Sequence, residues 1–319
     1  MNYRRLGRSG LKVSEIGLGS WLTYGGGVGD DTAQACIRRA FDLGVTFFDT
    51  ADIYERGAAE ECLGRVLPRY RRRDLVIATK CFFPMSDNPN DRGLSRKHIF
   101  ESIHDSLKRL QTDYVDLYQC HRPDPDVEME EIVRAMDDLI RQGKVLYWGV
   151  SEWPAAALRK AHVVAAALYA VPPVSEQAEY SLAARRVETN GVQQACLDLG
   201  MGMVVWSPLK QGLLTGKYSG AKVPAGSRAA HPRMSIFMPK IHRPLTDRVD
   251  QLSPIAQRHR MTLAQLALSW LLTRPAVASV IIGATSVAQV EENCSLPDAD
   301  LSAEDLARMD ALFPASENP

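Results

Sequence analysis

The stretch Val45-Thr-Phe-Phe-Asp49-Thr-Ala-Asp-Ile-Tyr54 decides the fold. Its first four residues are apolar or β-branched, which is typical of a strand that is buried on both faces. Asp49 stands where this run ends, and Tyr54 follows in the next loop. In parallel α/β folds a ligand lies beyond the carboxyl ends of the strands, so these two side chains indicate a site. Taken alone, the stretch is more readily explained by a capping aspartate and a surface tyrosine.

The composition is that of a soluble globular protein, with 45% hydrophobic and 24% charged residues in a chain of 319. The formal net charge is zero, which argues against a face for nucleic acid and against a polybasic membrane anchor. Residues 1–6 lack the apolar core of a signal peptide, and no run approaches the roughly 18 apolar residues of a membrane span. We therefore expect a cytoplasmic protein with neither a nucleic-acid nor a membrane partner.

The six cysteines are widely dispersed, and none lies in a Cys-x-x-Cys pair. This spacing favours reduced thiols over a disulfide framework or a zinc site. No metal is therefore expected.

Apolar runs and helical patterns alternate along the whole chain. Eight runs predict strands, which begin near residues 16, 45, 75, 114, 145, 174, 203 and 279. Helices are predicted over residues 31–43, 58–67, 95–110, 128–142, 187–199, 246–259, 262–273 and 302–313. Two further helices are predicted to begin at residues 154 and 286. Eight βα units favour an α/β fold of the parallel (β/α)₈ TIM-barrel type over an open sheet.

Two further segments complete this predicted architecture. Residues 3–16 resemble a β-hairpin with its turn at Ser9-Gly10, and it would cover the barrel floor. The helix at 302–313 would close the chain. The segment 210–245 is a long loop rich in Gly, Pro, Lys and Arg, which is typical of a functional or mobile segment. Nothing else interrupts the alternation, so we expect one domain over 1–319.

Three neighbouring predicted strands end on a charged or titratable residue, namely Asp49, Lys80 and His121, and Tyr54 follows the first of them. Each residue alone is more readily explained as a cap or an ion-pair partner. In a barrel, however, all strand ends meet at one face, so the four together favour a catalytic site.

The chemistry of this set is general acid catalysis. A phenol has an ordinary pKa of about 10 and keeps its proton near neutrality. A neighbouring ammonium makes it a better donor, and a carboxylate balances the buried ammonium. A histidine can donate a hydrogen bond to a carbonyl. The set suits protonation of an oxygen whose carbon gains a hydride, and that hydride requires a cofactor.

These residues stand in motifs that resemble the aldo-keto reductases from Tyr3 to about Asn293. The motifs are Phe48-Asp-Thr-Ala-Asp-Ile-Tyr54, Ala78-Thr-Lys80, Arg109-Leu-Gln-Thr-Asp-Tyr-Val-Asp-Leu117, Gly149-Val-Ser151, Gln177-Ala-Glu-Tyr180 and Trp206-Ser-Pro-Leu209. The resemblance implies an NADPH-dependent enzyme that reduces a small-molecule aldehyde or ketone to an alcohol. It also implies a catalytic tetrad of Asp49, Tyr54, Lys80 and His121, with Tyr54 as the proton donor.

Within that family, the sequence looks most like the branch of potassium-channel beta subunits and their bacterial relatives. The motifs Leu18-Gly-Ser-Trp21, Gly93-Leu-Ser-Arg-Lys-His-Ile99, Arg122-Pro-Asp124 and Gly216-Lys-Tyr218 carry this likeness. The channel subunits have asparagine where this chain has His121, so the resemblance implies a working reductase. The alternative is a cofactor-binding, redox-sensing regulatory subunit with vestigial activity.

The resemblance also implies where NADPH lies. Ser151 and Gln177 match positions that hold the nicotinamide carboxamide, and Trp206 matches an aromatic residue stacked on its ring. Lys217 and Arg228 match positions around the adenosine 2′-phosphate. The full set of implied cofactor positions is Ser20, Trp21, Asp49, Ser151, Gln177, Trp206, Ser207, Pro208, Leu209, Lys217, Arg228, Gly283, Thr285, Gln289, Glu292 and Asn293.

Three aromatic residues, Trp21, Tyr24 and Trp153, are predicted to wall the substrate pocket. Large aromatic walls favour apolar or aromatic aldehydes, although the same residues could equally pack the barrel rim. The sequence leaves open the physiological substrate, the preference between NADPH and NADH, and whether the chain forms a homo-oligomer.

Overall fold

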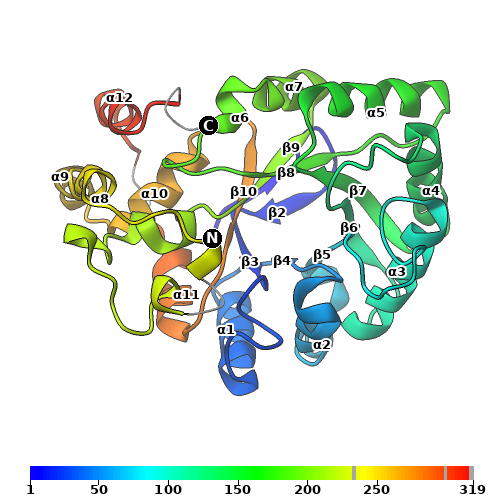
Figure 1. Cartoon of the computed structure of the whole chain (residues 1–319), viewed down its shortest axis with the longest axis horizontal. Helices are drawn as coiled ribbons and strands as arrows, with labels where there is room; N and C mark the ends of the chain where they lie inside the picture. Colours follow the sequence, from blue (N-terminus) through cyan, green and yellow to red (C-terminus); the bar gives the residue numbers. More distant parts are fainter. Residues whose placement is uncertain (232–234, 298–299, 316–319) are drawn as a thin grey trace.

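The computed structural model describes residues 1–231, 235–297 and 300–315, and these form a closed barrel of eight parallel strands (Figure 1). The predicted TIM-barrel fold is therefore confirmed. The barrel strands, in chain order and in order around the barrel, are β3 (Ile16–Gly19), β4 (Phe47–Asp49), β5 (Val76–Cys81), β6 (Val115–Cys120), β7 (Val145–Ser151), β8 (Ser175–Glu179), β9 (Gly202–Trp206) and β10 (Val277–Ile282).

Helices surround the strands, as Figure 1 shows. The α-helices are α1 (Asp30–Asp42), α2 (Ala58–Gly64), α3 (Arg96–Leu110), α4 (Met129–Arg141), α5 (Ala155–Ala167), α6 (Arg186–Thr189), α7 (Val192–Leu199), α8 (Arg243–Asp250), α9 (Ser253–Arg258), α10 (Leu263–Leu272), α11 (Val287–Cys294) and α12 (Ala303–Leu312). Short 3₁₀ turns are η1 (Tyr54–Gly57), η2 (Leu67–Arg69), η3 (Arg72–Asp74), η4 (Lys210–Thr215), η5 (Ser219–Ala221), η6 (Arg228–Ala230) and η7 (Ser235–Phe237). None of the described helices has the length and apolar character that crossing a membrane requires.

Two helices that the sequence predicts as continuous are divided. The one expected at 187–199 breaks into α6 and α7 at Gly191, whose φ of +82° cannot continue a right-handed helix. The one expected at 246–259 breaks into α8 and α9, where Pro254 stands in the first turn of α9 and has no N–H for a helical bond to α8. Pro154 is the extended N-cap of α5 rather than part of its first turn.

The hairpin covers the floor of the barrel, as predicted. Strand β1 (Tyr3–Arg5) pairs antiparallel with β2 (Lys12–Ser14). Leu6 and Val13 are fully buried, and they pack with Phe47 and Leu117 in the apolar cluster that also holds Val204. Burying these side chains removes apolar surface from water at one end of the barrel. The other end, where the strands finish, is left for polar residues.

The parallel arrangement brings those strand ends to one face. Asp49 pairs with Ala78 of β5, and Lys80 pairs with Gln119 of β6. His121 follows the last residue of β6 directly. The order β4, β5, β6 therefore places the three predicted strand-end residues on adjacent strands.

Gly64 allows the close contact between α2 and α3, and we predict that Gly64→Ala destabilises the fold. A Cβ at Gly64 would stand 2.1 Å from the carbonyl oxygen of Arg109. Alanine is intrinsically a better helix former by about 1 kcal/mol, but the overlap forces backbone movement. We expect a net loss of about 2 kcal/mol or more in the free energy of unfolding, measured by urea denaturation.

Gly29→Ala is the matched control, because a Cβ there meets no atom within 4 Å and the backbone φ is −60°. It should change the unfolding free energy by about 1 kcal/mol or less. Equal stability of Gly64→Ala and wild type would show that α2 and α3 are not in such close contact.

Candidate active site

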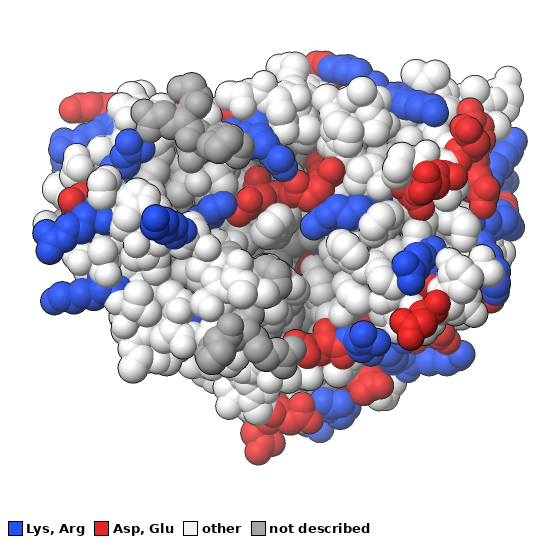
Figure 2. All heavy atoms as spheres, in the orientation of Figure 1, with Lys and Arg blue, Asp and Glu red and all other residues white. Residues whose placement is uncertain are grey.

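A cavity of about 870 Å³ opens at the carboxyl ends of the barrel strands. Figure 2 shows this molecule hollowed near the middle of one face, with acidic and basic side chains interspersed over the surface. The predicted cofactor positions that line the cavity are Trp21, Asp49, Ser151, Gln177, Trp206, Ser207, Pro208, Leu209, Lys217, Arg228, Gly283, Thr285, Gln289, Glu292 and Asn293. Residues from almost every strand end thus share one space.

The four residues of the predicted tetrad lie together at the base of this cavity. The Nζ of Lys80 donates to Asp49 Oδ2 and to the carbonyl oxygen of Thr50, both at 2.7 Å, and to Tyr54 Oη at 3.2 Å. The His121 ring packs edge-on against the Tyr54 ring, with centroids 5.7 Å apart. Lys80 is fully buried behind the wall that Asp49, Tyr54 and His121 form.

Burial and charge oppose each other at Tyr54 and Lys80. Burial raises the pKa of Tyr54 and the nearby Asp49 carboxylate adds to the rise, while the Lys80 ammonium opposes it. The sequence suggested that Lys80 would strengthen the phenol as an acid, but in the structure burial outweighs that effect. Burial favours a neutral Lys80, yet Asp49 and Tyr54 more than compensate and raise the pKa of Lys80. The resting site therefore holds a phenol beside an ammonium.

His121 is the neutral member of the set. Burial, followed by the positive charges of Lys80 and Arg122, holds the pKa of His121 well below its ordinary value. Its imidazole therefore carries a single N–H near neutrality. Such a ring can donate a hydrogen bond without adding a charge to the cavity.

Asp49 also organises the amides on the far side of the barrel. Its Oδ1 accepts from Gln177 Nε2 at 2.8 Å and from Gln119 Nε2 at 3.4 Å. Ser151 Oγ donates to the carbonyl oxygen of Gln177 at 2.9 Å. Ser151 and Gln177, which come from β7 and β8, are thereby fixed side by side in the cavity wall.

Trp206 is held by a residue that the sequence did not single out for a role, Glu152. The indole Nε1 donates to Glu152 Oε1 at 2.9 Å, and the same carboxylate accepts from the backbone N–H of Glu179 and from Arg186. Glu152 adopts φ +58°, which is rare for a side chain other than glycine. Trp206 also packs edge-on against Trp21, with centroids 6.0 Å apart. The rarely populated backbone conformation of Glu152, together with three hydrogen bonds to its carboxylate, indicates that Glu152 fixes the position of this indole.

The other end of the cavity carries two adjacent cations, Lys217 and Arg228. Burial lowers the pKa of both, and the charge of Arg228 lowers that of Lys217 further. Within the described residues, neither side chain forms an ion pair with a carboxylate. A Cβ on Gly212 would stand 2.5 Å from Lys217 Nζ, so the glycine makes room for the lysine. Two repelling, partly desolvated cations in a cavity fit a phosphate group.

Comparison with known proteins agrees with this geometry. The chain matches the model described as "Aldo/keto reductase family" over residues 15–313. It belongs to the aldo/keto reductase family. Membership supports an oxidoreductase that binds a nicotinamide cofactor, NADH or NADPH.

Two relatives of this aldo/keto reductase are named as channel subunits. It is 43% identical over 304 residues to a "Probable voltage-gated potassium channel subunit beta" of Oryza sativa subsp. japonica, covering 93% of this chain and 92% of that protein. It is 44% identical over 305 residues to a protein of Arabidopsis thaliana with the same name, again covering 93% and 92%. The predicted likeness to the channel-subunit branch is confirmed.

Two of the three predicted pocket aromatics lie elsewhere in this aldo/keto reductase. Tyr24 is fully buried in the core beside Cys36, and burial raises its pKa well above the ordinary value. Trp153 is 1% exposed and packs in the same core. Of the three, Trp21 alone lines the cavity. The correction follows from packing, because both rings are buried in the main apolar core and are covered from the cavity.

Ser20 is also covered, and its hydroxyl donates to Thr50 Oγ1 at 2.8 Å instead of lining the cavity. Other residues line the cavity that the sequence did not assign to it. They include Leu22, Ile53, Glu55, Phe83, Arg122, Gln211, Thr215 and His231. Phe83 and Arg122 lie two residues after the ends of β5 and β6, and this position in the sequence could have indicated that they line the cavity.

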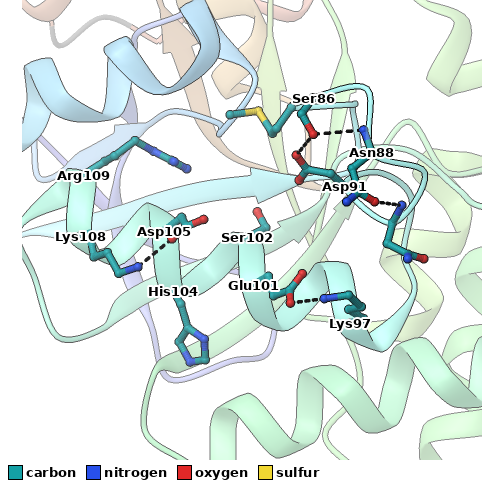
Figure 3. Close-up of a pocket in the computed structure, with 12 residues that line it drawn as sticks. Ser86, Asn88, Asp91, Lys97, Glu101, Ser102, His104, Asp105, Lys108 and Arg109 are labelled. Atoms are coloured by element: carbon teal, nitrogen blue, oxygen red, sulfur yellow. Dashed lines mark hydrogen bonds and ion pairs between the residues drawn. The ribbon is translucent and has the colours of Figure 1, made fainter.

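A second hollow, of about 520 Å³, lies between α3 and the loop after β5 (Figure 3). Its charged side chains are mostly paired with each other, as in Lys97 with Glu101 and Lys108 with Asp105. Ser102 on its floor donates to the buried Asp52 at 2.8 Å. Asp52 itself is fully buried and lines neither this hollow nor the larger cavity.

Asp52 makes the stability of the fold depend on pH. Burial, with the nearby Glu60, raises the pKa of Asp52 from 3.8 to about 7. Between these values the folded chain holds a proton that the unfolded chain has released, so stability falls as pH rises. We predict that wild type loses about 2 to 4 kcal/mol relative to Asp52→Asn between pH 4 and pH 7, measured by urea denaturation.

The exposed Asp126→Asn is the control, and its stability difference from wild type should stay constant over the same range. A constant difference for Asp52→Asn as well would mean that Asp52 ionises normally in the fold.

Proposed function

We propose that this chain is an NADPH-dependent reductase of aldehydes or ketones, in which Tyr54 donates the proton. The observation that carries the proposal is the phenol of Tyr54 within 3.2 Å of Lys80, beside a paired Asp49, at the wall of an 870 Å³ cavity. A phenol so placed can reach a carbonyl oxygen bound in that cavity.

The residues of the site divide the work of protonation. The bound cofactor supplies a hydride to the carbonyl carbon. The neutral imidazole of His121 donates a hydrogen bond to the carbonyl oxygen and orients it. As negative charge develops on that oxygen, Tyr54 transfers its proton to it and becomes a phenolate. Lys80 stabilises the phenolate, Asp49 keeps Lys80 charged, and solvent later restores the proton to Tyr54.

Residues on either side of the tetrad support the choice of cofactor. Ser151 and Gln177 offer polar groups to a carboxamide, and Trp206 offers a fixed aromatic face next to them. Lys217 and Arg228 form the cationic end that fits a 2′-phosphate. The distinction between NADPH and NADH rests on that cationic end.

A second candidate function is a redox-sensing regulatory subunit with vestigial activity. The names of the rice and Arabidopsis relatives favour it. It predicts tight cofactor binding with very slow turnover across all carbonyl compounds. The presence of His121 beside Tyr54 favours the reductase.

We predict that Tyr54→Phe lowers kcat/KM for aldehyde reduction by about 10²- to 10⁴-fold, because it removes the proton donor. The dissociation constant for NADPH should change little. NADPH consumption with aliphatic, aromatic and sugar aldehydes measures the first quantity, and fluorescence titration measures the second.

Tyr24→Phe is the matched control, since it deletes a phenol oxygen in the core outside the cavity. It should retain activity. An unchanged rate in Tyr54→Phe would exclude Tyr54 as the donor, and no turnover by wild type with any aldehyde would favour the regulatory subunit.

We also predict that Lys217→Met and Arg228→Met each raise the KM for NADPH by about 10- to 100-fold, because each removes a charge-assisted contact to phosphate. The KM for NADH should stay nearly constant. Steady-state rates with both cofactors provide the measurement, and Lys222→Met, an exposed lysine of the same loop, is the control. Equal effects on both cofactors would contradict a 2′-phosphate site.

A further inference from the structure

Arg122 stands at the wall of the cavity beside two members of the tetrad. It follows His121 directly after β6, and it lines the same space as Tyr54 and Phe83. Its Nη1 donates to the carbonyl oxygen of His121 at 2.5 Å and to Ser151 Oγ at 3.4 Å. Its guanidinium carbon lies 5.5 Å from the centre of the Phe83 ring. These contacts hold the group in place.

The guanidinium keeps donors that nothing in the described structure uses. Arginine carries five N–H groups in a planar fork. The two hydrogen bonds above both come from Nη1, and among the described residues no carboxylate lies within ion-pair distance of Arg122. A cation that is partly removed from water gains most from an anion that reaches it inside the cavity.

The nearby acids do not neutralise this charge. Both oxygens of Asp49 are engaged, one by Lys80 and the other by Gln177. Glu176 is fully buried, and burial raises its pKa well above the ordinary value, which favours its neutral form. In the described structure its carboxyl group forms no ion pair with Arg122, and its Oε1 accepts from the backbone N–H of Trp153.

Glu55 also lines the cavity, but its carboxylate lies over the loop that follows β3. Its Oε2 is 3.4 Å from the place where a Cβ on Gly26 would stand. Strand β3 is three strands from β6 around the barrel. Glu55 forms no ion pair with Arg122 in the part of the chain that the structure describes.

We propose that Arg122 is a specificity residue that binds a carboxylate on the substrate, so that the preferred substrates are aldehydes carrying a second, anionic end. This inference rests on the reductase function proposed above. The planar fork of arginine matches a carboxylate with two parallel hydrogen bonds. Phe83 offers an apolar face for the part of the substrate between its two ends.

Two aldehydes of nearly equal shape test the proposal. The 4-carboxybenzaldehyde anion and neutral 4-nitrobenzaldehyde differ in charge but hardly in size. Wild type should prefer the carboxylate, and Arg122→Met should lower the ratio of the two kcat/KM values by about 10- to 100-fold, mainly through KM of the anion. Arg122→Lys keeps the charge but not the fork, so it should give an intermediate ratio. If Arg122→Met does not fold, Arg122→Lys still tests the proposal.

Lys210→Met is the matched control, because this lysine pairs with Glu179 near the rim and does not line the cavity. It should leave the ratio unchanged. An unchanged ratio in Arg122→Met, or an equal loss with both aldehydes, would overturn the proposal and leave Arg122 as a support for His121. Such results would not affect the reductase function.

If wild type consumes no NADPH with these two aldehydes or with any other aldehyde tested, the reductase function fails instead. Titration with 4-carboxybenzyl alcohol, the alcohol that reduction of 4-carboxybenzaldehyde would give, then decides the case for Arg122 separately. Weaker binding by Arg122→Met than by wild type would support the anion site, and equal binding would overturn it.

Discussion

The buried ion pair between Lys80 and Asp49 is the constraint on which the rest of the site depends. Either charge alone would be several kcal/mol too costly to keep in this interior, so the two must arrive together. They do so because β4 and β5 are parallel neighbours in register and both end at the same face of the barrel. The ammonium then has further donors free for the Thr50 carbonyl and for Tyr54. The phenol of Tyr54 is thus positioned by a contact that the barrel register creates.

The same pair fixes more distant parts of the wall. The second oxygen of Asp49 holds Gln177 of β8 and Gln119 of β6, so one carboxylate links strands on several sides of the barrel. Ser151 of β7 joins through the Gln177 carbonyl. Groups supported in this way by strands hold their geometry better than groups supported by loops. The cavity wall that faces the reaction is therefore largely preorganised.

The features of the fold that depend on local sequence pattern could be predicted from the sequence. Each barrel strand was visible as an apolar run, and Asp49, Lys80 and His121 were found because the barrel rule sends every strand end to one face. Side-chain direction beyond a strand end was not predictable, because tertiary packing decides it. Tyr24 follows β3 as Trp21 does, yet it turns into the core beside Cys36 of α1. The role of Glu152 depends on a backbone φ of +58°. A glutamate in the sequence does not indicate such a value, whereas a glycine or an asparagine can.

Burial shifts the pKa values of the two neutral donors, Tyr54 and His121, in opposite directions. It raises the pKa of Tyr54 and lowers that of His121, so both rings hold one transferable or donatable proton and no charge. Among the four tetrad residues, which all lie in the described part of the chain, the opposite charges of Lys80 and Asp49 form a pair. Three cationic side chains also line the cavity, namely Arg122, which follows His121 in the chain, and the neighbouring Lys217 and Arg228. In the proposed function, this pairing of charges would let anionic groups of the cofactor and the substrate bind to the cations without taking the proton that Tyr54 delivers to the carbonyl oxygen.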